Sequence, residues 1–144
     1  MGYLPLHSSH FALPFKALLN EIAPVKDVGA WRAYINDGKP TQIFITDPEH
    51  PIAQGVKGFT IPKTERYDVP FQVPVPSARS KTVVFGGTYA DGQHARQRLC
   101  WTIGQRSRFV LPPGHKEYPI FFQPEVQKIV TNAVHWLAGP STSK

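Results

Sequence analysis

The stretch PEVQKIVTNAVHWLAG, residues 124–139, has the clearest structural pattern in this sequence. Pro124 suits the first position of a helix, because the N–H that proline lacks has no partner there. Gly139 suits the position after the last helical residue, and Pro140 prevents the helix from continuing. The apolar residues between these ends recur at helical spacing: Val126, Ile129, Val130, Ala133, Val134 and Leu137. The stretch therefore predicts a helix with one buried face.

Strand patterns precede this helix. Residues 98–103 and 107–111 are rich in apolar and β-branched side chains, and Gly104-Gln105 predicts a turn between them. Further upstream the pattern predicts strands at 41–46 and 82–85, a helical turn at 51–55, an extended piece at 59–61 and a turn at 89–92. Four prolines in residues 62–80 exclude a helix or a central strand, so this segment is predicted to be a loop or an edge.

The N-terminal residues predict a strand, a turn and a helix. Residues 3–6 form a short apolar run, and His7-Ser8-Ser9-His10 follows directly. The apolar residues after this turn lie on one helix face: Phe11, Phe15, Leu18, Leu19 and Ile22. Helices interspersed with strands indicate an α/β fold with a partly parallel, partly antiparallel sheet. One domain over residues 1–139 and a disordered tail at 140–144 are expected.

Composition and charge narrow the functional classes. A chain of 144 residues with 12% aromatic residues suits one packed domain. No run of 18 apolar residues occurs, so no transmembrane helix or membrane partner is predicted. The single cysteine, Cys100, excludes an intramolecular disulfide and favours a reducing, cytoplasmic location. The net charge is +6, but the cations are interleaved with apolar residues along predicted strands, so nucleic acid is not expected as a partner.

Three histidines are candidate functional residues. Ligands of open α/β sheets bind beyond the carboxyl ends of the strands, and His7 and His115 each follow a predicted strand. His10 lies three residues after His7, so both can face one ligand in a helical turn. Together with Glu65, these histidines suit acid/base catalysis or the binding of one metal ion. The alternative is that the histidines bond backbone carbonyls and that Glu65 is a solvated surface charge.

Six segments in the same order resemble the ThuA family, the trehalose-utilisation-like proteins. They are LPLHSSHFALPFKALL (4–19), DPEHPIA (47–53), ERYDVPF (65–71), RLCWTIG (98–104), PGHKEYP (113–119) and NAVHWLA (132–138). The resemblance implies a class I glutamine amidotransferase-like, flavodoxin-related α/β sheet with flanking helices. Members of the family normally carry further βαβ units before the His-Ser-x-His turn. The resemblance therefore implies a domain that lacks its N-terminal part.

The resemblance also implies chemistry on a sugar. By analogy, His7 stands where amidotransferases keep their cysteine nucleophile, and His115 matches their catalytic histidine. A histidine in place of the thiol argues against glutamine hydrolysis. The implied substrates are trehalose, related disaccharides and their oxidised keto-glycosides, which an isomerase or hydrolase would process by acid/base or metal-assisted steps.

The implied site has three groups of residues. The catalytic set is His7, His10, Glu65 and His115, and the substrate-binding set is Ser8, Tyr67 and Tyr118. A zinc-like divalent metal on His7, His10 and His115 is one option for a cofactor. A sugar dehydrogenase of the same pathway and a second copy of the chain are the expected protein partners. The alternative function is a non-catalytic carbohydrate- or metal-binding module, or an inactive truncated remnant.

Overall fold

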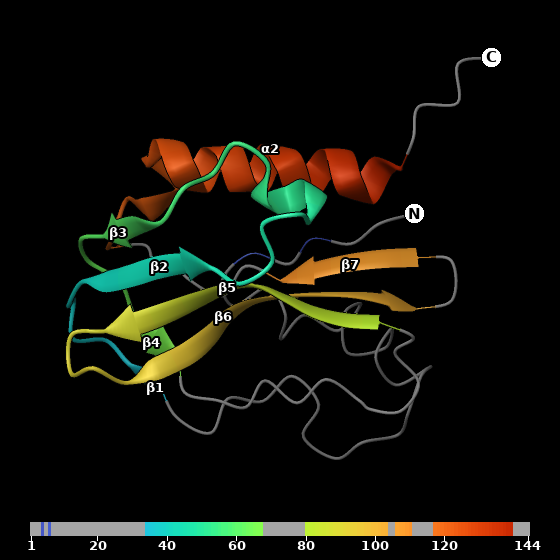
Figure 1. Cartoon of the computed structure of the whole chain (residues 1–144). Helices are drawn as coiled ribbons and strands as arrows, with labels where there is room; N and C mark the ends of the chain where they lie inside the picture. Colours follow the sequence, from blue (N-terminus) through green and yellow to red (C-terminus); the bar gives the residue numbers. More distant parts are fainter. Residues whose placement is uncertain are drawn as a thin grey trace.

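The computed structural model describes residues 4, 6, 34–67, 80–103, 106–110 and 117–139 (Figure 1). In these ranges the chain forms strands, two 3-10 helices and one long helix. The strands are β1 (Tyr34–Ile35), β2 (Thr41–Ile45), β3 (Phe59–Ile61), β4 (Arg66–Tyr67), β5 (Ser80–Tyr89), β6 (His94–Ile103) and β7 (Arg106–Val110). The helices are η2 (Pro51–Ala53), η3 (Ile120–Phe122) and α2 (Pro124–Ala138). The predicted strand at 3–6 and helix after it lie largely outside the described residues.

Five of the strands form one sheet in the order β3-β2-β5-β6-β7. Each neighbouring pair is antiparallel, and β1 pairs with β4 in a separate antiparallel ladder. The α/β class is therefore confirmed, but the parallel pairs that the sequence predicts are not found among the described strands. Short connections explain this for β5, β6 and β7, because consecutive antiparallel strands can be joined by tight turns, whereas parallel strands need long crossovers. The predicted turn at 89–92 is one such connection: the Tyr89 N–H donates to the Gln93 carbonyl at 2.9 Å.

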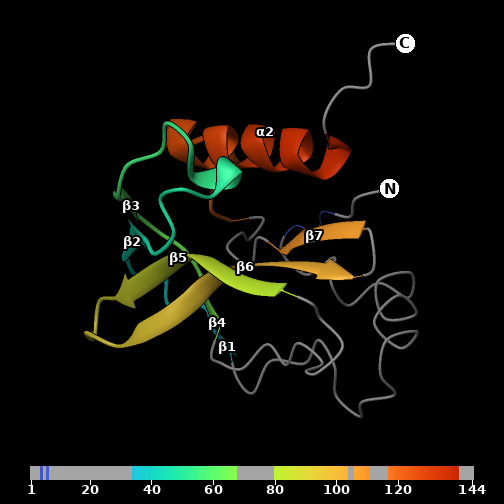
Figure 2. The same ribbon diagram turned by 45° about the vertical axis from the view of Figure 1, so that its right-hand side comes forward.

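Helix α2 lies across one face of the sheet (Figures 1 and 2). Its bounds confirm the helix predicted from residues 124–139, and Gly139 adopts a φ of 75° after its last residue. Val126, Ile129 and Ala133 are fully buried in the core that the helix shares with the sheet. Val134 is instead 52% exposed, although the spacing places it on the same stripe. It follows Val126 by eight residues, which turns it roughly 80° around the helix axis, to the edge of the buried face.

The short helix η2 packs against α2 and is held at both ends by side chains. At its start, the Ile52 N–H donates to the His50 Nδ1 at 3.2 Å. Beyond its end, the Asn132 side-chain amide of α2 donates to the carbonyls of Ile52 and Gln54, at 3.0 and 2.8 Å. Burial lowers the pKa of His50, against the opposing effect of the Asp47 carboxylate. His50 is therefore kept as a neutral acceptor at neutral pH.

Strand β5 contains a close approach between backbone and ring. Gly86 pairs with Phe44 of β2, and a Cβ atom at position 86 would overlap the Phe44 ring. The register of β5 against β6 also shifts on both sides of Phe85. Glycine is therefore favoured at this point, because any side chain would have to displace the ring of Phe44.

Candidate functional site

The structure describes three of the seven residues that the sequence predicts for the site. His7, Ser8, His10 and His115 lie outside the described residues. Tyr67 is the last residue of β4, where its backbone pairs with Tyr34. Glu65 and Tyr118 are the two predicted residues whose side chains are described. They provide the starting point for a candidate site.

Glu65 lies in the interior of the protein. Glu65 is 5% exposed. The alternative that it is a solvated surface charge is therefore wrong. The preceding residue, Thr64, is also buried, and its hydroxyl donates to the Glu65 carbonyl at 3.3 Å. Carboxylates are seldom buried without a structural or chemical role, because removing a charge from water is costly. Burial therefore makes Glu65 the strongest described candidate for a functional carboxylate.

Tyr118 is fixed by the turn that precedes β2. Its hydroxyl donates to the Asn36 Oδ1 at 2.6 Å, and the Asn36 amide nitrogen donates to the Glu117 Oε2 at 3.5 Å. Gly38 makes this arrangement possible, since its φ is +62° and a Cβ atom there would lie 3.0 Å from the Tyr118 hydroxyl. The phenol is thus held over a backbone position that has no side chain.

Three carboxylates act on this phenol. Burial raises the pKa of Tyr118, and the negative charges of Glu117, Glu65 and Asp37 raise it further. Glu65 and Tyr118, which are 53 positions apart in the sequence, are therefore close enough in the fold to interact electrostatically. A phenol with a raised pKa stays protonated at neutral pH, and its oxygen can still accept a hydrogen bond from a ligand.

We expect Tyr118 to titrate above the ordinary phenol value of 10.0 in the folded protein. As the pH rises, the phenol of the unfolded chain loses its proton before that of the folded protein. The contribution of the protonated Tyr118 to the free energy of unfolding is therefore complete below about pH 10 and is lost as the pH rises further. Ultraviolet titration of the wild type minus that of Tyr118→Phe isolates this one phenol. Urea unfolding at about pH 9 and 11 tests the linkage. A difference midpoint at or below 10 would contradict the expected direction.

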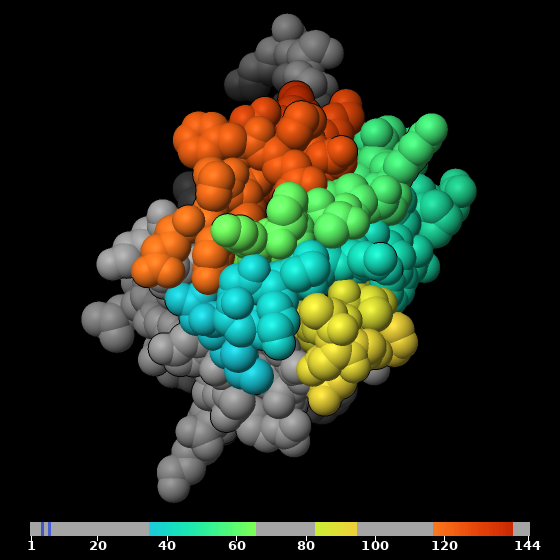
Figure 3. All heavy atoms as spheres, turned by 90° about the vertical axis from the view of Figure 1, so that its left-hand side faces the viewer, coloured from blue at the N-terminus to red at the C-terminus, as the bar shows by residue number. Residues whose placement is uncertain are grey.

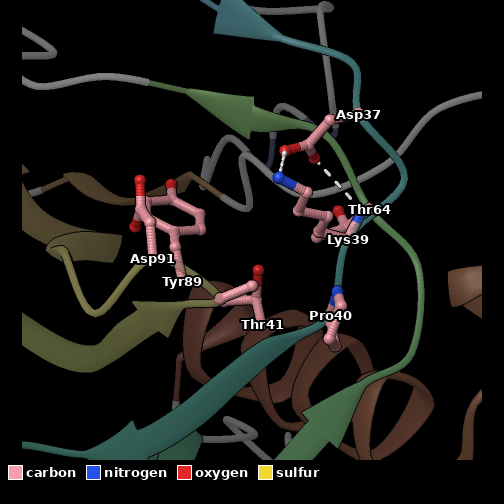
Figure 4. A pocket seen from close by; sticks show the side chains of 8 residues that line it. Asp37, Lys39, Pro40, Thr41, Thr64, Tyr89 and Asp91 are labelled. Carbon is pink, nitrogen blue, oxygen red and sulfur yellow. Dashed lines mark hydrogen bonds and ion pairs between the residues drawn. The ribbon is translucent and has the colours of Figure 1, made fainter.

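A pocket lies near Glu65 and Tyr118, although neither residue lines it. Its empty volume, with the open solvent at its mouth included, is about 280 Å³. It is lined by residues from the turn before β2, the strand ends and the β5–β6 turn (Figure 4). Figure 3 shows the segments that enclose it side by side, with residues around 36–45 next to the end of the β5–β6 hairpin. Asp37 lines the pocket and also acts on Tyr118, and Thr64 lines it beside Glu65. The pocket and the two predicted residues thus belong to one corner of the molecule.

Several residues of this corner were not singled out by the sequence. Asn36, Asp37 and Gly38 form a turn pattern that would have marked the position, since all three residue types favour turns. Thr41 and Tyr89 carry no local sign of a role, because the sequence predicts Thr41 in a strand and Tyr89 in a turn. Their place in the pocket follows from the pairing of β2 with β5, where they lie opposite each other.

Within the described ranges no helix is long and apolar enough to cross a membrane. The same part of the chain contains no group of three or more His, Cys, Asp or Glu side chains arranged to hold a metal ion. The three histidines considered as metal ligands lie outside it. The metal site therefore remains a prediction.

The comparison with protein-family models identifies the family of this chain. A family model described as trehalose utilisation, ThuA, matches residues 1–137. Among solved structures, the chain resembles a ThuA-like protein from Bacteroides uniformis, with 15% identity and a TM-score of 0.62. It also resembles a cytoplasmic protein from Salmonella typhimurium, with 15% identity and a TM-score of 0.56. No curated protein is a significant match.

These structural likenesses concern the fold. Each alignment covers 94% of this chain, but 58% of the Bacteroides protein and 55% of the Salmonella protein. The chain thus spans somewhat more than half the length of the two solved structures. The chain shares its overall fold with them at low sequence identity.

Proposed function

Since the chain belongs to the ThuA family, described as trehalose utilisation, we propose that it acts on trehalose or a related disaccharide, with oxidised keto-glycosides as the reactive substrates. Isomerisation or cleavage of a keto-sugar requires a proton to move next to a carbonyl group. That step needs a positioned acid or base and groups that orient the hydroxyls of the sugar. The corner formed by Glu65, Tyr118 and the nearby pocket has side chains suited to both tasks.

The burial of Glu65 carries this proposal. A carboxylate shielded from bulk water can exchange a proton directly with a bound substrate, because few solvent molecules compete for that proton. We assign Glu65 the role of general base or acid. Tyr118 orients the sugar, since its hydroxyl hydrogen is committed to Asn36 and its oxygen remains able to accept from a sugar hydroxyl.

The remaining predicted residues complete the proposed site. His7, His10 and His115 are assigned to acid/base steps or to a divalent metal such as zinc, and Ser8 and Tyr67 to substrate binding. These assignments rest on the family resemblance, and no step above depends on the metal. We also propose that the complete fold is of the class I glutamine amidotransferase-like type. The keto-glycoside would be supplied by a sugar dehydrogenase, because its carbonyl arises by oxidation of a hydroxyl.

We expect the purified protein to consume the keto derivative of trehalose and to leave trehalose itself chemically unchanged, because only the former has a carbonyl beside an acidic C–H. Chromatography of the reaction mixture measures substrate loss and product, with heat-unfolded protein as the control. Binding of both sugars without turnover, measured by equilibrium dialysis, would support the alternative of a carbohydrate-binding module. If the protein neither bound nor converted either sugar, that result would contradict a role in the chemistry of these sugars.

A further inference from the structure

Thr41 has a buried hydroxyl group whose hydrogen-bonding capacity is unused. The residue is 2% exposed, and its Oγ1 has no hydrogen-bond partner within the described part of the protein. In Figure 4 this oxygen points into the pocket, between Tyr89 and Asp91 on one side and Asp37 and Lys39 on the other. Buried polar atoms without a partner are rare and cost folding free energy. A ligand or a water molecule that fills the pocket would remove that cost.

The pocket has a buried floor and a charged rim. Thr41, Thr64 and Tyr89 are buried and each carries a hydroxyl group, whereas Lys39 and Asp91 of the rim are exposed. The empty volume of about 280 Å³ includes open solvent at the mouth of the pocket, so the enclosed space is much smaller than this figure. The space therefore suits one edge of a sugar ring whose remainder lies at the open mouth, not a whole disaccharide.

The charges of the rim favour a neutral ligand. Lys39 is the one cation among the described lining residues, and its ammonium group lies 3.5 Å from the Asp37 carboxylate. Asp91 adds a second carboxylate, which accepts from the Gln93 N–H at 3.1 Å. An anionic ligand would meet two carboxylates and a cation that is already paired. A polyol offers hydroxyls that can both donate to carboxylates and bond the floor.

We propose that the pocket is a subsite for one ring of a neutral sugar, in which the Thr41 hydroxyl bonds a sugar hydroxyl. This subsite rests on the sugar substrate proposed for Glu65 and Tyr118. It lies near both residues, since Asp37 of its lining acts on Tyr118 and Thr64 of its lining directly precedes Glu65. A disaccharide with one ring here would extend its second ring toward Glu65. Thr41 is then a residue that determines binding and takes no part in the chemistry.

Thr41→Val tests this role, because valine keeps the shape of threonine and removes the hydroxyl. We expect glucose and trehalose, each titrated by calorimetry into the full chain, to bind about tenfold more weakly to the variant, the value of roughly one hydrogen bond. The melting temperature of the unliganded variant should be equal to or above that of the wild type. Thr60→Val, at an exposed position of β3, is the matched control and should bind both sugars as the wild type does.

Each outcome has a distinct meaning. Equal binding of both sugars to Thr41→Val would overturn the subsite, and a lowered melting temperature with unchanged binding would identify a structural water instead. Chemical-shift mapping of wild-type protein with glucose provides a check without a variant. Shifts are expected at residues 37–41 and 89–91, and their absence at saturation would overturn the subsite. If the subsite were overturned but the protein still converted the keto-disaccharide, the proposed function would be unaffected.

Discussion

Replacement of Glu65 by glutamine is expected to lower the turnover of a keto-disaccharide at least about 100-fold, the typical contribution of a positioned general acid or base. Glutamine has nearly the same shape as glutamate but cannot exchange a proton at neutral pH. Substrate binding should change much less, because the amide can still form hydrogen bonds. The loss should therefore appear in kcat, with KM nearly unchanged.

Two controls separate chemistry from folding in this experiment. Glu49→Gln removes the same charge at an exposed position and should retain wild-type turnover. The Glu65→Gln variant should also show a lower pKa for Tyr118 than the wild type, because one of the three charges that raise it is gone. A shifted Tyr118 titration with full turnover would show that Glu65 lies beside the phenol but takes no part in catalysis.

Replacement of Ile129 by alanine is expected to lower the free energy of unfolding by about 2–5 kcal/mol. Ile129 is fully buried in α2 and belongs to the core that joins this helix to the sheet. The variant loses the transfer free energy of the removed carbons and leaves a cavity that neighbouring side chains only partly fill. Urea unfolding, with the midpoint and the slope fitted separately, measures the change.

Val134→Ala is the matched control for this effect. Val134 lies on the same helix but is 52% exposed, so its replacement should change the free energy of unfolding by no more than about 0.5 kcal/mol. If both variants were destabilised equally, the stability of α2 would depend on its helix propensity and not on its packing against the sheet. Similar small losses in both would indicate that α2 contributes little to the stability of the described core.

The sequence predicts elements well where several local signals coincide. The helix at 124–138 has a proline at its start, a glycine after its end and an apolar stripe between them, and the structure confirms its bounds. Strands β5 and β6 are longer than predicted, 80–89 and 94–103 in place of 82–85 and 98–103. Gly86-Gly87 and the polar residues at the start of β6 interrupt the apolar pattern, but ladder pairing continues through them.

The candidate site depends on contacts that a local pattern does not contain. Asn36 and Tyr118 are 82 positions apart, yet they share a hydrogen bond of 2.6 Å. The burial of Glu65 also runs against its surroundings in the sequence, where charged and polar neighbours favour solvent. The residues themselves and the family resemblance identified Glu65 and Tyr118 as candidates, whereas Thr41 required knowledge of which strands pair.

The contact between Gly86 and Phe44 has a consequence for how this sheet can change. The residue at each position limits which residues fit at the other. Alanine at position 86 displaces the ring of Phe44, whereas a small residue at position 44 leaves room for that alanine. Their effects on stability should then be non-additive, with the double variant less impaired than the two single ones would suggest. In relatives of this chain, the residues at positions 44 and 86 should therefore vary together, so that a large residue at one position accompanies a small residue at the other.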